Sequence, residues 1–154
     1  MRTPILDAIG NTPLVELVRV VPPGSARVVA KLESANPTGS MKDRVARALV
    51  EGGVRDGLSG GPTGSHGIEG IGIGFSPPLS WRAEVDEILT VTTADAKAMA
   101  RRLAREEGIF AGTSTGANVV AALRVGARLG AAATVATVVV DSGLRYVSTD
   151  VFRT

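Results

Sequence analysis

The chain has 154 residues, with 44% hydrophobic and 21% charged side chains and a formal net charge of +2 at pH 7. This apolar content can offset the entropy cost of ordering the chain, so the composition predicts a folded domain and excludes intrinsic disorder. The absence of cysteine and the single histidine exclude disulfides, a catalytic thiol and a metal site built from thiolates or several histidines.

The basic residues are scattered, with Arg101 and Arg102 as the only adjacent pair. They do not form the continuous stripe that follows a phosphate backbone, so no nucleic-acid partner is expected. The most apolar run, residues 131–140, is too short to span a bilayer, and the N-terminus lacks an apolar stretch of signal-peptide length. We therefore expect a soluble, cytoplasmic protein with no membrane partner.

The first half of the chain predicts two strands and a helix. Residues 14–18 alternate apolar and polar side chains at the period of a strand, and residues 27–32 form a second β-rich run. Ser40 is a good helix N-cap with Asp43 at the capping-box position, and the helix is expected to end at the glycines 52–53.

The second half alternates strands and helices after a Gly-, Ser- and Pro-rich stretch at residues 52–78, which has the composition of a linker or a functional loop. We expect a strand at 87–92, a helix capped by Thr93, a helix at 117–129 and a β-branched strand at 134–140 that is buried on both faces. This alternation predicts an α/β fold with a mostly parallel twisted sheet and flanking helices.

Lys42 lies in the first turn of the predicted helix. The positive end of a helix disfavours an ammonium group and favours the neutral amine that Schiff-base chemistry requires. The alternative is an exposed lysine beside Asp43, and spacing alone favours that alternative.

Two further segments are candidate ligand sites. Residues 112–116 (GTSTG) precede a helix and could cradle an anion with backbone N–H groups and hydroxyls, or could form an ordinary helix N-cap. Ser142 follows the predicted strand at 134–140, where the carboxyl ends of parallel strands line a ligand crevice, although residues 141–143 also suit a simple β-turn.

Five segments together resemble the cysteine synthase family and, more widely, the pyridoxal-phosphate enzymes that include cystathionine β-synthase. They are residues 9–15 (IGNTPLV), 36–44 (NPTGSMKDR), 66–75 (HGIEGIGIGF), 107–117 (EGIFAGTSTGA) and 141–149 (DSGLRYVST). The resemblance implies a shortened version of the tryptophan-synthase-β-like pyridoxal-phosphate fold, pyridoxal 5′-phosphate as cofactor and a homodimer.

The resemblance also implies roles for individual residues. Lys42 would hold the cofactor and, when released from it, act as the base at the substrate's α-carbon. Ser142 would hydrogen-bond the pyridine nitrogen. The glycine-rich loop would complete the site, with a cofactor contact at Gly72 and the substrate-pocket residues Gly70, Ile71 and Gly74.

The chain departs from the family pattern in its middle. The family has a long central segment between elements that here end near residues 57–58 and resume near 61–62. Neither its loop for the substrate carboxylate nor its phosphate-binding loop is found in this sequence. We therefore expect two joined segments in one compact unit, 1–58 with the lysine motif and 59–154 with the pocket loop and the ring-nitrogen motif.

The implied function is a pyridoxal-phosphate-dependent β-replacement that forms cysteine from an O-activated serine and sulfide. Two alternatives stay open: a non-catalytic truncated remnant that acts as a dimerising or partner-binding α/β domain, and an anion-binding domain without cofactor that uses residues 114–116. The enzyme hypothesis predicts that the Lys42 amine and the Ser142 hydroxyl face one cavity. Loss of the middle should also leave unpaired sheet edges that favour self-association.

Overall fold

The computed structural model describes residues 4–52 and 86–153. In chain order the elements are α1 (Pro4–Asp7), β1 (Leu14–Leu17), β2 (Arg27–Leu32), the 3₁₀ turn η1 (Glu33–Ala35), α2 (Lys42–Gly52), α3 (Thr93–Arg102), the π-helical turn η3 (Leu103–Glu107), α4 (Thr113–Leu129), β3 (Thr134–Val139) and the 3₁₀ turn η4 (Gly143–Tyr146). Within these ranges no helix is both long and apolar enough to cross a membrane.

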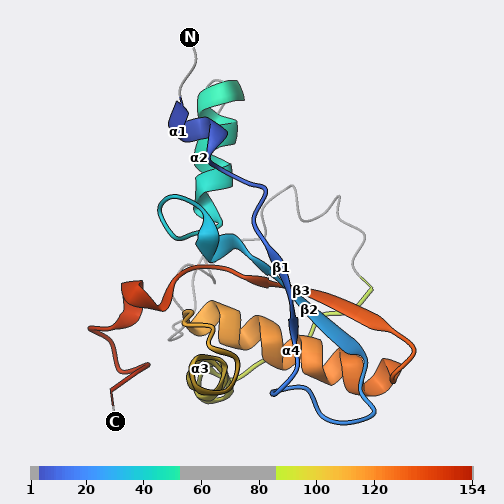
Figure 1. Cartoon of the computed structure of the whole chain (residues 1–154). Helices are drawn as coiled ribbons and strands as arrows, with labels where there is room; N and C mark the ends of the chain where they lie inside the picture. Colours follow the sequence, from blue (N-terminus) through green and yellow to red (C-terminus); the bar gives the residue numbers. More distant parts are fainter. Residues whose placement is uncertain (1–3, 53–85, 154) are drawn as a thin grey trace.

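The three described strands form one sheet in the order β1-β2-β3 (Figure 1). β1 runs antiparallel to β2, with Val15 opposite Ala30, and β2 runs parallel to β3, with Ala30 opposite Thr137. The predicted α/β class is confirmed. The part of the sheet that the structure describes is mixed, because β1 enters it antiparallel.

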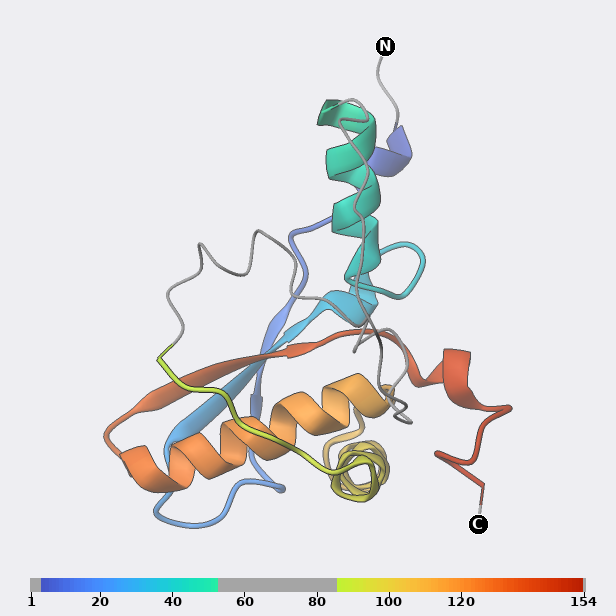
Figure 2. The ribbon, with the colours of Figure 1, turned by 180° about the vertical axis from the view of Figure 1, so that it is seen from behind.

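Helices α3 and α4 pack on one face of this sheet, while α1 and α2 stand together beyond its end (Figures 1 and 2). The contact between sheet and helices forms an aliphatic core whose buried members include Leu17, Val28, Ala30, Leu103, Val119 and Val139. Short aliphatic side chains suffice here because α3 and α4 approach closely at Gly116, where an added Cβ would lie 2.9 Å from the Ala96 carbonyl carbon.

The strand predicted at residues 87–92 is wrong. This segment pairs with no strand of the described part of the chain and instead runs along α4 (Figure 2). Side chains of that helix bind its polar groups: Arg128 forms an ion pair with Glu87, and Arg124 donates to the Thr90 carbonyl at 2.7 Å. Thr92, one residue before the predicted cap, caps α3 by accepting from the Asp95 amide at 3.1 Å.

Two other elements differ from the sequence prediction, α4 in its first residue and β3 in its burial. α4 begins at Thr113, so residues 113–116 belong to its first turn and do not precede the helix. β3 is a strand as predicted, but it is not buried on both faces: Thr134 and Ala136 are exposed because α3 and α4 cover only one face of the described sheet. The domain boundary expected at residue 58 lies outside the described residues.

Candidate functional site

The segment before α2 and the segment after β3 are joined through their backbones. The Met41 amide donates to the Val140 carbonyl at 2.8 Å, and the Ser142 amide donates to the Gly39 carbonyl at 2.8 Å. Between these bonds Ser40 and Asp141 form an antiparallel bridge. Two motifs that lie far apart in the sequence therefore meet at the carboxyl end of β3.

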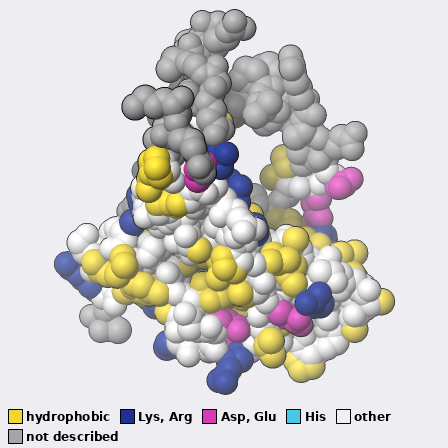
Figure 3. Space-filling view, turned by 45° about the horizontal axis from the view of Figure 1, so that its top comes forward, with side chains coloured by type: hydrophobic (Ala, Val, Ile, Leu, Met, Phe, Trp, Pro, Cys, Tyr) yellow, Lys and Arg dark blue, Asp and Glu magenta, His cyan; other side chains and the backbone are white. Residues whose placement is uncertain are grey.

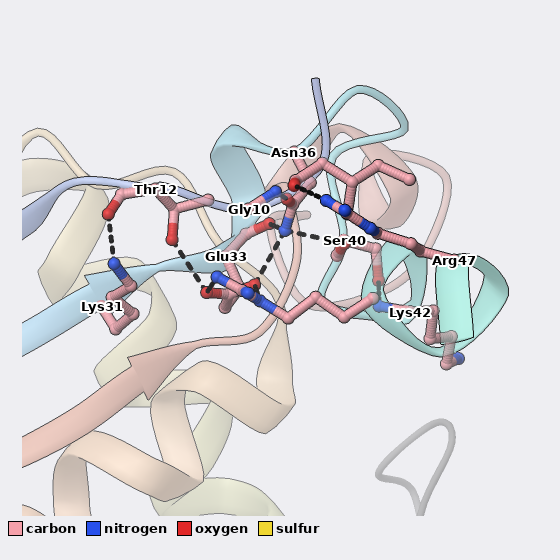
Figure 4. A network of polar contacts seen from close by, with 10 residues as sticks. Gly10, Thr12, Lys31, Glu33, Asn36, Ser40, Lys42 and Arg47 are labelled. Atoms are coloured by element: carbon pink, nitrogen blue, oxygen red, sulfur yellow. Dashed lines mark hydrogen bonds and ion pairs between the residues drawn. The ribbon is translucent and has the colours of Figure 1, made fainter. Parts of the chain in front are cut away.

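Lys42 is the first residue of α2 and is exposed. Its backbone N–H donates to the Ser40 hydroxyl at 3.3 Å, so Ser40 caps the helix as predicted. Its side chain extends away from the neighbouring polar network (Figure 4), and its Nζ has no hydrogen-bond or ion-pair partner among the described residues. The exposed position is also the one that the alternative of a surface lysine beside Asp43 predicts, and it leaves the amine accessible.

Ser142 is half-buried at the N-terminus of η4, where its Oγ accepts from the Leu144 amide at 3.3 Å. A hydroxyl that accepts one bond keeps its own proton for donation to a ligand. Gly39 packs directly on this serine: its φ of +76° suits glycine, and a Cβ added there would lie 3.4 Å from the Ser142 Cβ. The lysine loop and Ser142 are thus in contact.

A buried carboxylate, Glu33, organises the residues around the lysine loop (Figure 4). Its Oε1 accepts from the Thr12 hydroxyl at 2.8 Å, and its Oε2 accepts from the Asn36 side-chain amide at 2.8 Å. The Arg44 guanidinium completes the set with two bonds of 2.6 and 2.8 Å. Asn36 in turn accepts from the Gly10 amide at 2.9 Å, which ties the N-terminal motif to the lysine motif.

The surroundings of Glu33 strongly favour its charged form. The hydrogen bonds from Arg44, opposed by burial and assisted by Thr12 and Asn36, lower the pKa of Glu33 from 4.5 to about 2. We did not predict this residue from the sequence. The available signal was a charged side chain that directly follows a β-rich run, where burial requires a partner of opposite charge.

The loop itself is closed by a second set of contacts. The Asp43 carboxylate accepts from the Thr38 amide at 2.8 Å and from the Thr38 hydroxyl. Arg145, three residues after Ser142, donates to the Thr38 carbonyl at 2.8 Å. Asp43 therefore reaches back past Ser40 to Thr38, so the arrangement is a longer variant of the predicted capping box.

Residues 112–116 serve the packing of α4. The Thr115 hydroxyl accepts from the Val140 amide at 3.0 Å, and Gly116 lies against the backbone of α3. Gly112 leaves room for Tyr146, since a Cβ there would lie 2.7 Å from the Tyr146 Cζ. These contacts give a structural reason for each of the three residues.

Asp141, the residue before Ser142, is buried. Its Oδ2 accepts from the Tyr146 hydroxyl at 2.7 Å, whereas its Oδ1 has no hydrogen-bond partner among the described residues. A buried carboxylate held by one tyrosine fixes the turn that carries Ser142. The other predicted site residues, Gly70, Ile71, Gly72 and Gly74, lie outside the described residues.

Comparison with known proteins accounts for this combination of motifs. The model of the family described as pyridoxal-phosphate-dependent enzymes matches residues 5–69 and 57–141, which together are most of the chain. The chain belongs to this family. The two matched stretches overlap at residues 57–69.

Relatives and solved structures agree with this assignment. A cysteine synthase of Staphylococcus aureus is 43% identical over 95 residues, which are 62% of this chain and 31% of the relative. The crystal structure of cysteine synthase from Entamoeba histolytica matches with a TM-score of 0.77 at 20% identity, over 97% of this chain and 90% of that one. The O-acetylserine-dependent cystathionine β-synthase of Helicobacter pylori matches with a TM-score of 0.80 at 18% identity, over 96% and 98%.

The sequence match thus spans about a third of the length of the curated relatives, while the structural match shows the fold of pyridoxal-phosphate enzymes. Two residues in the part of the chain that the structure describes have the chemistry that this cofactor requires. Lys42 has an amine without a partner among those residues, which could react with the aldehyde, and the half-buried Ser142 has a hydroxyl proton that it could donate to the pyridine nitrogen.

Proposed function

We propose that this chain binds pyridoxal phosphate through Lys42 and catalyses a β-replacement that forms cysteine from an O-activated serine and sulfide. Membership of the family and the relatives named cysteine synthase support the class of reaction. The observation that carries the proposal is the backbone pairing of residues 39–41 with residues 140–142, which sets the lysine motif against Ser142.

Each residue has a defined task in this proposal. When bound, pyridoxal phosphate withdraws electrons from the substrate's α-carbon and so permits loss of the β-substituent. Lys42 holds the cofactor and, once released, removes and returns the proton at the α-carbon. The Ser142 hydroxyl donates to the pyridine nitrogen and, unlike a carboxylate, does not hold that nitrogen protonated.

The proposal also assigns tasks to the glycine-rich loop. Gly72 would contribute a cofactor contact, and Gly70, Ile71 and Gly74 would contribute to the substrate pocket. Glycine suits such positions because the backbone can approach a bound ligand without interference from a Cβ.

The proposal is tested by labelling the lysines. Purified protein is mixed with excess pyridoxal phosphate, reduced with borohydride, digested and mapped by mass spectrometry. We expect the adduct at Lys42 and little at the other two lysines, because Lys31 donates to the Thr12 carbonyl and Lys97 is ion-paired with Asp150 at 2.7 Å.

Two variants serve as controls. Lys42→Ala should lose the adduct and any formation of cysteine from O-acetylserine and sulfide, while Lys97→Ala should keep both. Equal labelling of all three lysines, or no labelling, would contradict the enzyme proposal. That outcome would favour a non-catalytic α/β domain.

We also propose that the chain assembles as a homodimer in the cytoplasm. The support for the dimer is physical: β1 and β3 each have one edge without a partner strand among the described residues. The face in Figure 3 also carries several groups of apolar side chains. Large exposed ones on the described surface include Ile88, Leu144 and Val18. Unpaired strand edges and exposed apolar groups favour association between copies.

A further inference from the structure

The side chains that contact Glu33 come from both sides of Lys42 along the chain. Asn36 opens the loop that leads to Lys42, and Arg44 follows Lys42 by two residues in α2. Both donate to the same carboxylate, Asn36 at 2.8 Å and Arg44 at 2.6 Å. The segment that presents the lysine is therefore held at two points by one buried group.

A third contact connects this clamp to the N-terminal motif. Thr12 donates at 2.8 Å to the Glu33 Oε1, which also accepts from Arg44, and the Gly10 amide donates to Asn36 at 2.9 Å. Gly10, at a φ of +98°, also lies close to the Arg44 guanidinium, which a Cβ added to Gly10 would approach to 3.3 Å. The N-terminal segment thus lies against Asn36 and Arg44, which come before and after Lys42 in the chain.

We propose that Glu33 is a positioning residue, a buried anchor that holds residues 36–44 against the N-terminal segment so that Lys42 is presented in a fixed place to its ligand. This inference rests on the proposed role of Lys42 as the cofactor lysine. Glu33 itself does not contact Lys42; it acts through Asn36 and Arg44.

Physical reasons favour an anchor of this kind over a purely stabilising ion pair. Glu33 is buried, whereas the Arg44 side chain is 46% exposed, so solvent screens part of the attraction between the two charges. All of the carboxylate contacts described go to residues of the two motifs that frame the site. A lysine that must react at one place needs its backbone held, because misplacement by about an ångström is costly for a reaction.

The test uses substitutions at Thr12 that keep the Glu33–Arg44 pair and the fold. Thr12→Val preserves the side-chain shape but removes the hydroxyl donor, whereas Thr12→Ser keeps the donor. The first readout is the ratio of pyridoxal phosphate labelling at Lys42 to that at Lys97, with borohydride reduction and peptide mapping. The second readout is amide hydrogen exchange over residues 36–44 without cofactor.

We expect Thr12→Val to lower the Lys42 to Lys97 ratio about fivefold, the effect of losing one hydrogen bond, and to speed exchange over residues 36–44. Thr12→Ser should restore both values. Glu33→Gln should shift both readouts further, while Glu16→Gln, which breaks an exposed ion pair with Arg27 on the same sheet, should leave them unchanged.

The outcomes separate the two proposals. If the wild-type protein shows no preference for Lys42 but Thr12→Val still loosens residues 36–44, the cofactor role fails and the anchoring role of Glu33 holds. If Lys42 is labelled preferentially in wild type and equally so in Thr12→Val and Glu33→Gln, the cofactor role holds and the anchor is overturned. Unchanged hydrogen exchange in both variants also overturns it.

Discussion

At the scale of a single residue, the ionisation of Glu33 determines how the stability of the fold changes in acid. Its pKa is about 2 in the folded protein and 4.5 without its partners, chiefly because of the hydrogen bonds from Arg44. A carboxylate with a lowered folded pKa contributes stability that is complete above the unfolded pKa. That contribution is lost as the pH falls from about 4.5 to about 2.

We therefore expect wild type and Glu33→Gln to differ in free energy of unfolding at neutral pH and to converge near pH 2. The contribution lost by wild type on acidification is roughly 2–3 kcal/mol, since each pKa unit equals about 1.4 kcal/mol and solvent screens the exposed side of Arg44. Urea denaturation at a series of pH values measures this. If the free energies of unfolding of the two proteins change in parallel with pH, the ion pair does not stabilise the fold.

The titration of exposed acids does not affect the difference between wild type and Glu33→Gln. The pKa values of Glu87 and Asp150 are also lowered, by the hydrogen bonds from Arg128 and Lys97 respectively. Both carboxylates are present in the two proteins, so their titration cancels in the difference. The difference between wild type and Glu33→Gln isolates the buried group.

The absence of a side chain at Gly112 leaves room for the contact between Tyr146 and Asp141. The Tyr146 ring can reach Asp141 only because Gly112 has no Cβ, which would lie 2.8 Å from the Asp141 Oδ1. The Gly112 amide also donates to the Asp141 carbonyl at 3.4 Å. The start of α4 and the turn that carries Ser142 are consequently one packed unit.

At the scale of elements, the packing of α3 on α4 depends on Gly116. A Cβ there would lie 2.9 Å from the Ala96 carbonyl carbon and 3.0 Å from the Ala100 amide nitrogen, both backbone atoms that cannot rotate away. We expect Gly116→Ala to lower the free energy of unfolding by about 1–3 kcal/mol, because the helices must separate. Chemical denaturation monitored by circular dichroism measures the loss.

Gly126 in the same helix is the matched control. A Cβ there would meet the Ala26 Cβ at 3.5 Å, an ordinary contact. Alanine is favoured over glycine inside a helix by about 0.5–1 kcal/mol, so Gly126→Ala should be neutral or stabilising. Equal destabilisation by both substitutions would show that helix approach is not the cause.

Local patterns predicted most of these elements, and tertiary contacts account for the failures. The period-2 run at 14–18 and the apolar spacing after Thr92 are properties of the segments themselves, so the strand and the helix were predictable. Residues 87–92 also read as a strand, but Arg124 and Arg128 of α4 hold this segment along the helix. Nothing within the segment itself signals those partners.

In the candidate site, too, some residues could be singled out from the sequence and one could not. The lysine motif and Ser142 were predicted from their sequence motifs and from the position of Ser142 after a strand. Glu33 was not predicted, because its partners Thr12 and Arg44 lie in other motifs and meet only in the folded chain. A sequence motif identifies a candidate lysine more readily than a buried carboxylate whose partners meet only on folding.

At the scale of the whole molecule, the two edges of the described sheet differ in chemistry. β3 has the sequence TVATVV, without a charged residue, and Ala136 is exposed on its uncovered face. β1 carries Glu16, which pairs with Arg27 at 2.8 Å. Charged side chains protect a strand edge from pairing with another chain, so association is expected through β3.

We expect the weight-average mass in sedimentation equilibrium to rise above that of one chain as concentration increases, and Ala136→Lys to weaken this association about tenfold or more. The substituted residue is exposed, so the free energy of unfolding should change by less than about 0.5 kcal/mol. Leu14→Lys places the same charge at an exposed position of β1 and should leave association unchanged. A shift of equal size in both variants would mean that added positive charge alone, and not the β3 edge, controls assembly, because a contact through one edge responds only to a substitution at that edge.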